Sequence, residues 1–472
     1  MWAVAAMAAM LSTALPSAEV FAQTARPGDA AATVQVHRQI DRLLSQFLGA
    51  SGAVGYQSID VARAGAGFDF AIFDLRLHRA DGGAHTFGTV RGRLTPAGSR
   101  YDDVTLTLPE SWPYRDEAGR GGTVQLGRQR IAIRWDRVLR ASTSFDLEFG
   151  DITFTGDATT DLLMRADEIS ARSAMEDEDG LWSGPLRFRM RGVELTGNGA
   201  RMHLENVRLA VDLQRADLLR LAAARGANQA TGEPGSTAAA EKPLMAGMQL
   251  AIEMRDVGFQ TPERDQVRLA DVSYRLALSG ADQPQFDARI DVAHNGLLAT
   301  GQYAFWKLLE MRLQVLIEQI RSAELSRGVL ASGLDLALPG GDAADRDDEA
   351  LPRLVAALAQ AASTIRLEGE QTPAPGLDAS YDGAFQADPN AVYGWVGRLR
   401  VRVTDPTANG QEPDAEAMRY LTMIRPMGEP VDDGTALLYR FELRADGRLD
   451  LNGRPLLPAP APPVPQPQEQ TQ

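Results

Sequence analysis

The chain has 472 residues, and 63 Asp and Glu side chains against 48 Lys and Arg give it a net charge of −15. This acidic balance disfavours nucleic acid and anionic membrane surfaces as partners, because both are bound through concentrated basic surface. Cysteine is absent. Its absence excludes disulfides, thiol nucleophiles, cysteine-containing zinc sites, iron–sulfur clusters and a lipoprotein anchor.

Residues 1–22 are typical of a secretory signal peptide. An apolar run from Val4 to Leu15 is followed by Pro16 and then by Val20-Phe21-Ala22, which suits the positions before a cleavage site. No Lys or Arg precedes Arg26, so the positive charge that usually opens such a peptide is missing. We expect a periplasmic protein of a Gram-negative envelope, soluble or weakly anchored at its N-terminus, and not a lipoprotein.

The mature chain opens with a helical pattern and continues with strands. Apolar residues at three- and four-residue spacing predict one amphipathic helix, at Val36, Ile40, Leu43, Leu44 and Phe47. From there to about residue 213, short alternating segments end at Gly, Asp, Asn or Pro. This turn spacing is typical of antiparallel β structure.

One strand pattern occurs five times and dominates the chain. It is first seen from Leu147 to Phe154, where apolar residues alternate, shift by one position, and alternate again. The shift falls at a turn-forming residue in each copy: Asp151, Gly192, Asn206, Asp256 and Asp271. Because a shift of one residue sends side chains to the other face of a strand, we expect a β-bulge or tight bend at each of these positions.

The composition divides the mature chain into two β-rich halves. Residues 23–225 form the first half with its leading helix, and residues 243–457 form the second half with further helices. Residues 226–242 are rich in Gly, Ser, Pro and Ala and predict a flexible linker. Residues 458–472 are rich in Pro and Gln and predict a disordered tail.

Residues 305–320 predict an amphipathic helix in the second half. Its apolar stripe supplies our candidates for a ligand groove: Phe305, Leu309, Leu313, Leu316 and Ile320. A helix packed on the sheet through this stripe is the simpler interpretation. A membrane-surface or partner-binding helix is the alternative, although its polar face would usually be more basic.

The end of the second half suggests a family. Tyr439 to Leu443, the turn Asp446-Gly447 and the segment Leu451 to Leu456 form a predicted hairpin. This hairpin resembles the closing hairpin of uncharacterised bacterial envelope proteins of the YdgA-like kind, and the shifted strands are similar to those of AsmA-like envelope proteins. The resemblance implies an elongated, β-rich exported protein and supplies no catalytic residue.

The sequence contains no recognisable catalytic motif. The histidines His37, His78, His85, His203 and His294 have no metal-ligand spacing, and no nucleophile elbow or phosphate-binding loop is present. Two acidic clusters, Glu176 to Asp179 and Asp345 to Glu349, lack the ligand order of a calcium-binding loop. We predict no catalytic, cofactor or metal site.

These observations predict a mainly β fold: an elongated, twisted antiparallel sheet assembly with bulged repeat strands and a few packed amphipathic helices. The expected function is that of a non-enzymatic envelope protein which binds a lipid or another apolar ligand in a groove of a curved sheet. One alternative is a scaffold that pairs its exposed strand edges with an envelope protein. A carboxylate-based hydrolase is a further alternative, since it needs only two suitably spaced acidic residues.

Overall fold

The structure is a computed structural model of the chain. It describes residues 33–41, 54–78, 84–115, 121–139, 141–157, 161–218, 245–262, 266–299, 310–321, 363–374, 376–410, 413 and 415–457. The described part is mainly β with antiparallel pairing, as the sequence predicts. It forms two compact units. The predicted signal peptide, linker and C-terminal tail lie outside the described residues.

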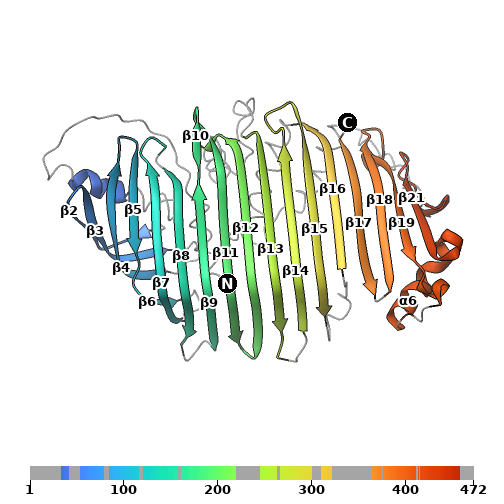
Figure 1. Cartoon of the computed structure of the whole chain (residues 1–472), viewed down its shortest axis with the longest axis horizontal. Coiled ribbons are helices and arrows are strands. Elements are labelled where there is room, and N and C mark those ends of the chain that lie inside the picture. The colour runs from blue at the N-terminus through green and yellow to red at the C-terminus, as the bar shows by residue number, and fades with distance from the viewer. Residues whose placement is uncertain are drawn as a thin grey trace, which may run out of the picture. The chain divides into compact units, whose positions relative to one another are not determined.

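Unit 1 contains an antiparallel meander in which the long strands lie side by side in chain order (Figure 1). Its strands are β1 (Val54–Gly55), β2 (Ser58–Ala64), β3 (Gly67–His78), β4 (Ala84–Ala97), β5 (Tyr101–Thr107), β6 (Ser111–Arg115), β7 (Gly121–Asp136), β8 (Ala141–Gly156), β9 (Leu162–Ala174), β10 (Glu176–Glu178), β11 (Leu181–Gly197), β12 (Ala200–Ala216), β13 (Gly247–Gln260) and β14 (Gln266–Ser279). The short strands β1, β6 and β10 pair with β3, β7 and β11.

The strands on either side of the predicted linker are neighbours. β12 pairs with β13 from Arg201 opposite Gln260 to Gln214 opposite Gly247. The two compact units instead divide within β15 (Gln285–Ala299), of which Asp287–Asp291 belong to unit 2. The compact units therefore do not coincide with the two predicted halves.

Unit 2 holds a second antiparallel set of strands and the helix α6. Its elements are β16 (Glu310–Arg321), β17 (Thr364–Ala374), β18 (Leu377–Ala387), β19 (Trp395–Thr404), η3 (Pro406–Asn409), α6 (Ala415–Ile424), η4 (Arg425–Met427), β20 (Glu429–Val431), η5 (Asp432–Gly434), β21 (Ala436–Leu443), β22 (Leu449–Leu451) and β23 (Arg454–Leu457). The predicted closing hairpin is confirmed, since Phe441 lies opposite Leu451 and Leu443 opposite Leu449. Gly447 in its turn has a positive φ of 80°.

The predicted N-terminal helix is present at residues 33–41. Val36 and Ile40 are buried and pack with Ile59, Phe70 and Ile72 of β2 and β3. These are two of the apolar positions whose spacing predicts the helix, so its amphipathic face covers this end of unit 1. The remaining predicted positions, Leu43, Leu44 and Phe47, lie outside the described residues.

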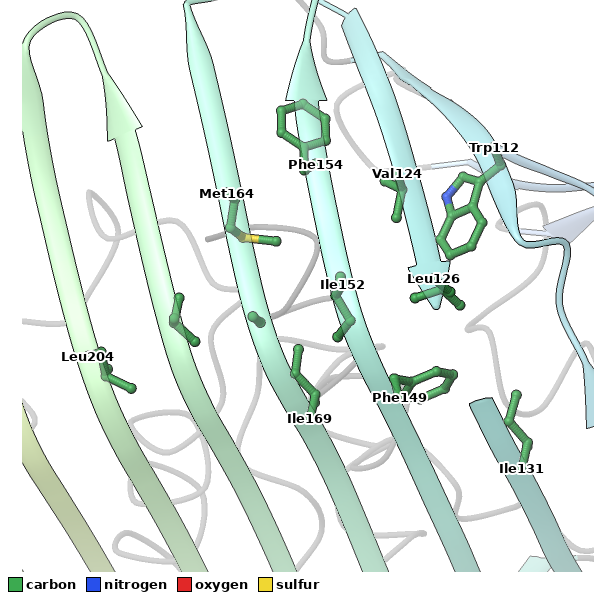
Figure 2. Packing of buried hydrophobic residues seen from close by; sticks show 12 residues of the cluster. Trp112, Val124, Leu126, Ile131, Phe149, Ile152, Phe154, Met164, Ile169 and Leu204 are labelled. Carbon is green, nitrogen blue, oxygen red and sulfur yellow. The ribbon is translucent and has the colours of Figure 1, made fainter. Parts of the chain in front are cut away.

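A large buried cluster of unit 1 is formed by residues of β6 to β9, β11 and β12. Figure 2 shows Phe149, Ile152 and Phe154 following one another along β8, with Met164 and Ile169 on the strand beside it. Phe149 and Ile152 are three positions apart, yet both are buried in the same cluster. A regular strand would turn them to opposite faces, so the backbone must change phase between them.

A line of interrupted pairing crosses the sheet at this level, and we call it the crease. At one level of seven strands a residue lacks its ladder pair: Gly127, Asp151, Asp167, Gly192, Glu205, Asp256 and Ala270. Between β9 and β11 the adjoining pair of Ala166 and Val193 is missing as well. The register is unchanged on either side; for example, Leu126 lies opposite Ile152 and Arg128 opposite Gly150. Because every strand changes phase at the same level, the apolar side chains stay on one face of the sheet.

Irregular backbone is found at three of the five predicted positions and one residue earlier in the other two, but none of these breaks shifts the register, so they are not β-bulges. Asp151, Gly192 and Asp256 have positive φ angles of 54°, 59° and 45°. Asn206 and Asp271 remain in the ladder, where both lie opposite Arg255. In β12 and β14 the residue without a ladder pair is the one before, Glu205 or Ala270. The neighbouring strand sets this level, because Gly192 or Asp256 adopts the left-handed backbone there.

Replacing Asp151 with valine should lower the free energy of unfolding by about 1–3 kcal/mol. Asp tolerates the left-handed backbone at this position, whereas a β-branched side chain there is strained. The ion pair of Asp151 with Arg128 is exposed and adds little. Asp151→Asn is the matched control and should stay within about 0.5 kcal/mol of wild type in urea unfolding. Equal stability of the two variants would contradict a strained site.

Candidate ligand-binding face

The strands β11 to β14 align their apolar side chains in continuous rows. Along the strands, apolar residues occupy every second position on each side of the crease. Across the strands, the ladder places like with like in five rows: Leu186–Val211–Leu250–Leu276, Phe188–Leu209–Ile252–Tyr274, Met190–Val207–Met254–Val272, Val193–Leu204–Val257–Leu269 and Leu195–Met202–Phe259–Val267. We call this surface the apolar face of unit 1.

The apolar face becomes less buried from β9 towards β14. Met164 and Ile169 on β9 are buried in the main cluster. On β13 no residue beyond Gly247 is buried, and β14 has no buried residue at all. Phe259 is 41% exposed. The apolar rows therefore retain solvent-accessible area on these two strands, which is typical of a surface that another apolar body covers.

Two polar groups belong to this part of unit 1, namely Tyr274 in the rows on β14 and His294 on β15. Tyr274 lies opposite Ile252, and burial raises the pKa of its hydroxyl. His294 lies close to the crease along β15. Two residues after it, Gly296 packs against Ala270 of the crease so closely that an added Cβ would be 3.0 Å from the Cβ of Ala270. The Nδ1 atom of His294 is buried and has no hydrogen-bond partner among the described residues, and burial lowers the pKa of this imidazole. Both shifts indicate a low-dielectric surface that favours uncharged groups.

The opposite face of the same strands is charged. Arg187 donates to Asp212 at 2.7 Å and Arg268 donates to Asp256 at 2.8 Å. Asp177, from the first predicted acidic cluster, accepts from the backbone N–H of Gly180 and pairs with Arg100 at 2.7 Å, so it stabilises a hairpin. The second acidic cluster lies outside the described residues. In the part of the chain that the structure describes, no group of three or more His, Asp or Glu is placed to hold a metal.

Unit 2 has an apolar face of the same design. Three rows cross β16 to β21: Leu313–Gly369–Tyr381–Val401–Tyr439, Val315–Leu367–Gly383–Leu399–Phe441 and Ile317–Ile365–Phe385–Gly397–Leu443. Glycine lies beside a large side chain where the rows are crowded. A Cβ on Gly397, for instance, would be 2.5 Å from the ring of Phe385. At the end of this face, Ala417 and Leu421 of α6 pack on Leu377 and Leu437.

The predicted helix at 305–320 is wrong over its described part, because Glu310–Arg321 form the strand β16. Leu313 lies on the apolar face, whereas Leu316 faces a depression of the charged face, and Ile320 is buried. Gln319, with a positive φ of 63°, changes the phase before Ile320. Phe305 and Leu309 lie outside the described residues. A run with apolar residues at most positions fits both the 3.6-residue period of a helix and the two-residue period of a strand. The β-branched Val315 and Ile317 favour the strand.

None of the helices in the described ranges has the length and apolar character needed to cross a bilayer. Comparisons with protein-family models, with curated proteins and with solved structures gave no match, so the site is interpreted from its own geometry.

Proposed function

We propose that the protein is an exported envelope protein that holds the acyl chain of a lipid along the apolar face of unit 1. The observation that carries this proposal is the set of apolar rows on β13 and β14 without a buried residue. β13 has 14 residues. At about 3.3 Å per residue it offers a continuous apolar path of about 45 Å, longer than an acyl chain.

The chemistry of the face favours an acyl chain over an extended protein segment. An extended polypeptide covering it would bring backbone N–H and C=O groups that need partners, and the rows offer only the hydroxyl of Tyr274. An acyl chain has no such requirement. The hydroxyl of Tyr274 then suits the uncharged or hydrogen-bonding end of a lipid. The signal-peptide pattern and the similarity of the strands to AsmA-like envelope proteins support the same proposal.

The scaffold alternative has less support in the described residues. The edge strand β2 pairs with β3 and has only seven residues. It carries Asp60 and Arg63, and charged side chains on a short edge strand discourage pairing with another chain. No observation favours the hydrolase alternative.

Fluorescence titration with cis-parinaric acid, a fluorescent fatty acid, tests the proposal. Ile252→Asn should weaken binding at least tenfold, because it places an amide in the middle of the apolar rows. Glu253→Gln, the next residue on the same strand, lies on the charged face and should bind like wild type. Native mass spectrometry of purified wild type should show co-purified lipid.

Two results would contradict the proposal. One is a folded Ile252→Asn variant that binds the fatty acid as wild type does. The other is a wild type that binds no fatty acid, combined with a lower free energy of unfolding for Ile252→Asn. That combination would show that other residues of this chain cover the face and that it is part of the core.

A further inference from the structure

A depression of about 560 Å³ lies on the charged face of unit 1 where the crease crosses β9 to β13. Its lining includes five guanidinium groups, those of Arg165, Arg189, Arg191, Arg208 and Arg255, and three carboxylates. In a chain with a net charge of −15, this is a local excess of positive charge. The depression lies on the opposite side of the sheet from the apolar rows, so it is separate from the proposed acyl site.

The guanidinium groups in this depression are poorly neutralised. Arg165 and Arg208 have neither a hydrogen bond nor an ion pair with the described residues. Arg191 is 3.5 Å from Glu168, and Arg255 is 3.7 Å from Asp271, both longer than a good hydrogen bond. The arginines therefore keep N–H donors available.

Two of these arginines lie directly opposite each other. Arg189 on β11 and Arg208 on β12 are a cross-strand pair, an arrangement that repels when no anion lies between the side chains. Asn206, only 7% exposed, accepts from Nε of Arg189 at 3.2 Å and so fixes the orientation of that guanidinium. An oriented donor group beside an unpaired one is a suitable geometry for an anion.

The charged face of unit 2 shows what a self-neutralised depression looks like. There Arg366 donates to Glu318 at 2.8 Å, Arg400 to Asp382 at 2.5 Å and Arg398 to Glu442 at 3.1 Å. All three arginines line one depression, and each has a carboxylate within hydrogen-bond distance. The lack of such partners at Arg165 and Arg208 is thus not a general property of this type of surface.

We propose that the crease depression of unit 1 binds a phosphate group. A phosphate offers several oxygens to converging guanidinium forks, whereas a carboxylate offers only two. The phosphate can neutralise the facing pair Arg189 and Arg208 while it also accepts from Arg191 or Arg255. Free phosphate and the phosphate of a lipid headgroup share this chemistry.

Isothermal titration calorimetry with two probes tests the site. The probes are inorganic phosphate and dihexanoyl phosphatidic acid below its micelle concentration, each titrated into the full chain at low ionic strength. The double variant Arg189→Gln/Arg208→Gln should bind both probes at least tenfold more weakly. Arg201→Gln is the control, because Arg201 is on the same strand as Arg208, has no partner among the described residues either, and does not line the depression. Equal affinity for both probes would identify the phosphate group alone as the ligand. Tighter binding of phosphatidic acid, lost in the double variant, would identify a headgroup.

Thermal unfolding provides a second readout. Without phosphate, the double variant loses both the repulsion between the two arginines and the hydrogen bond from Arg189 to Asn206, so its melting temperature in phosphate-free buffer is the reference. Added phosphate should raise the melting temperature of wild type and not that of the double variant. Absence of binding by wild type or unchanged affinity in the double variant would overturn the proposal.

Discussion

Replacing Asp136 with alanine should lower the free energy of unfolding by about 3–5 kcal/mol, since it removes one partner of a buried ion pair. The Asp136 side chain is completely buried. It accepts from Nε of Arg100 at 2.5 Å and from the backbone N–H groups of Val138 and Leu139 at 2.8 and 3.0 Å. The alanine variant leaves these donors without their acceptor. Urea unfolding followed by circular dichroism measures the change.

Two variants separate the carboxylate from the rest of this site. Asp136→Asn keeps an oxygen for the backbone donors and should lose less, about 1–2 kcal/mol. Asp103→Asn on β5 breaks the exposed ion pair with Arg134 and should change stability by less than about 1 kcal/mol. A loss below 1 kcal/mol for Asp136→Ala would show that Arg100, which also pairs with Asp177, compensates fully.

Replacing Arg425 with glutamine should lower the free energy of unfolding of unit 2 by about 2–4 kcal/mol at pH 7. The loss is smaller than for a fully buried ion pair because the arginine is half exposed. Arg425 follows α6 and donates to both carboxylate oxygens of Asp405, at 2.9 and 2.7 Å. Asp405 is 5% exposed. The variant would leave this carboxylate buried with only Thr407 as a donor. Arg419→Gln, on the exposed side of α6, is the control.

The cost of Arg425→Gln should decrease as the pH falls. Burial alone would raise the pKa of Asp405, but hydrogen bonds from Thr407 and Arg425 and the charge of Arg425 hold it below its usual value. A lowered pKa contributes stability that is present above the unfolded pKa, about 4, and is lost as the pH falls through the folded value. In the variant burial dominates, so protonation becomes favourable. Unfolding at pH 7 and pH 3 should show the smaller difference at pH 3. An equal difference at both pH values would contradict this account.

The strand content and the phase shifts could be predicted because both are local properties. Alternation gives the strands, and Asp or Gly at a shift marks a backbone that few other residues adopt. The exact level of each break depends on the neighbouring strand. For this reason the break in β12 falls at Glu205, next to the more obvious Asn206.

The candidate site could not be found in the same way. Each row of the apolar face joins residues from four strands, and a single strand does not show which residues lie opposite it. Residues 305–320 fit a helical pattern because Leu316 is apolar although it lies on the charged face. A polar residue there would have left the alternation of a strand visible at Val315 and Ile317. Similarly, the sequence does not show that Arg208 lies opposite Arg189, because the two residues are on different strands.

The crease also constrains how such a sheet can change its size. A hairpin that carries its own break in both strands, such as the pair with Gly192 and Glu205, could be copied or removed as a block while every remaining strand kept its apolar side chains on the same side. A strand without the break would present charged residues to the apolar face beyond that level. Such a sheet would thus gain or lose strands by whole hairpins, and a one-residue insertion or deletion within a strand would be the less tolerated event.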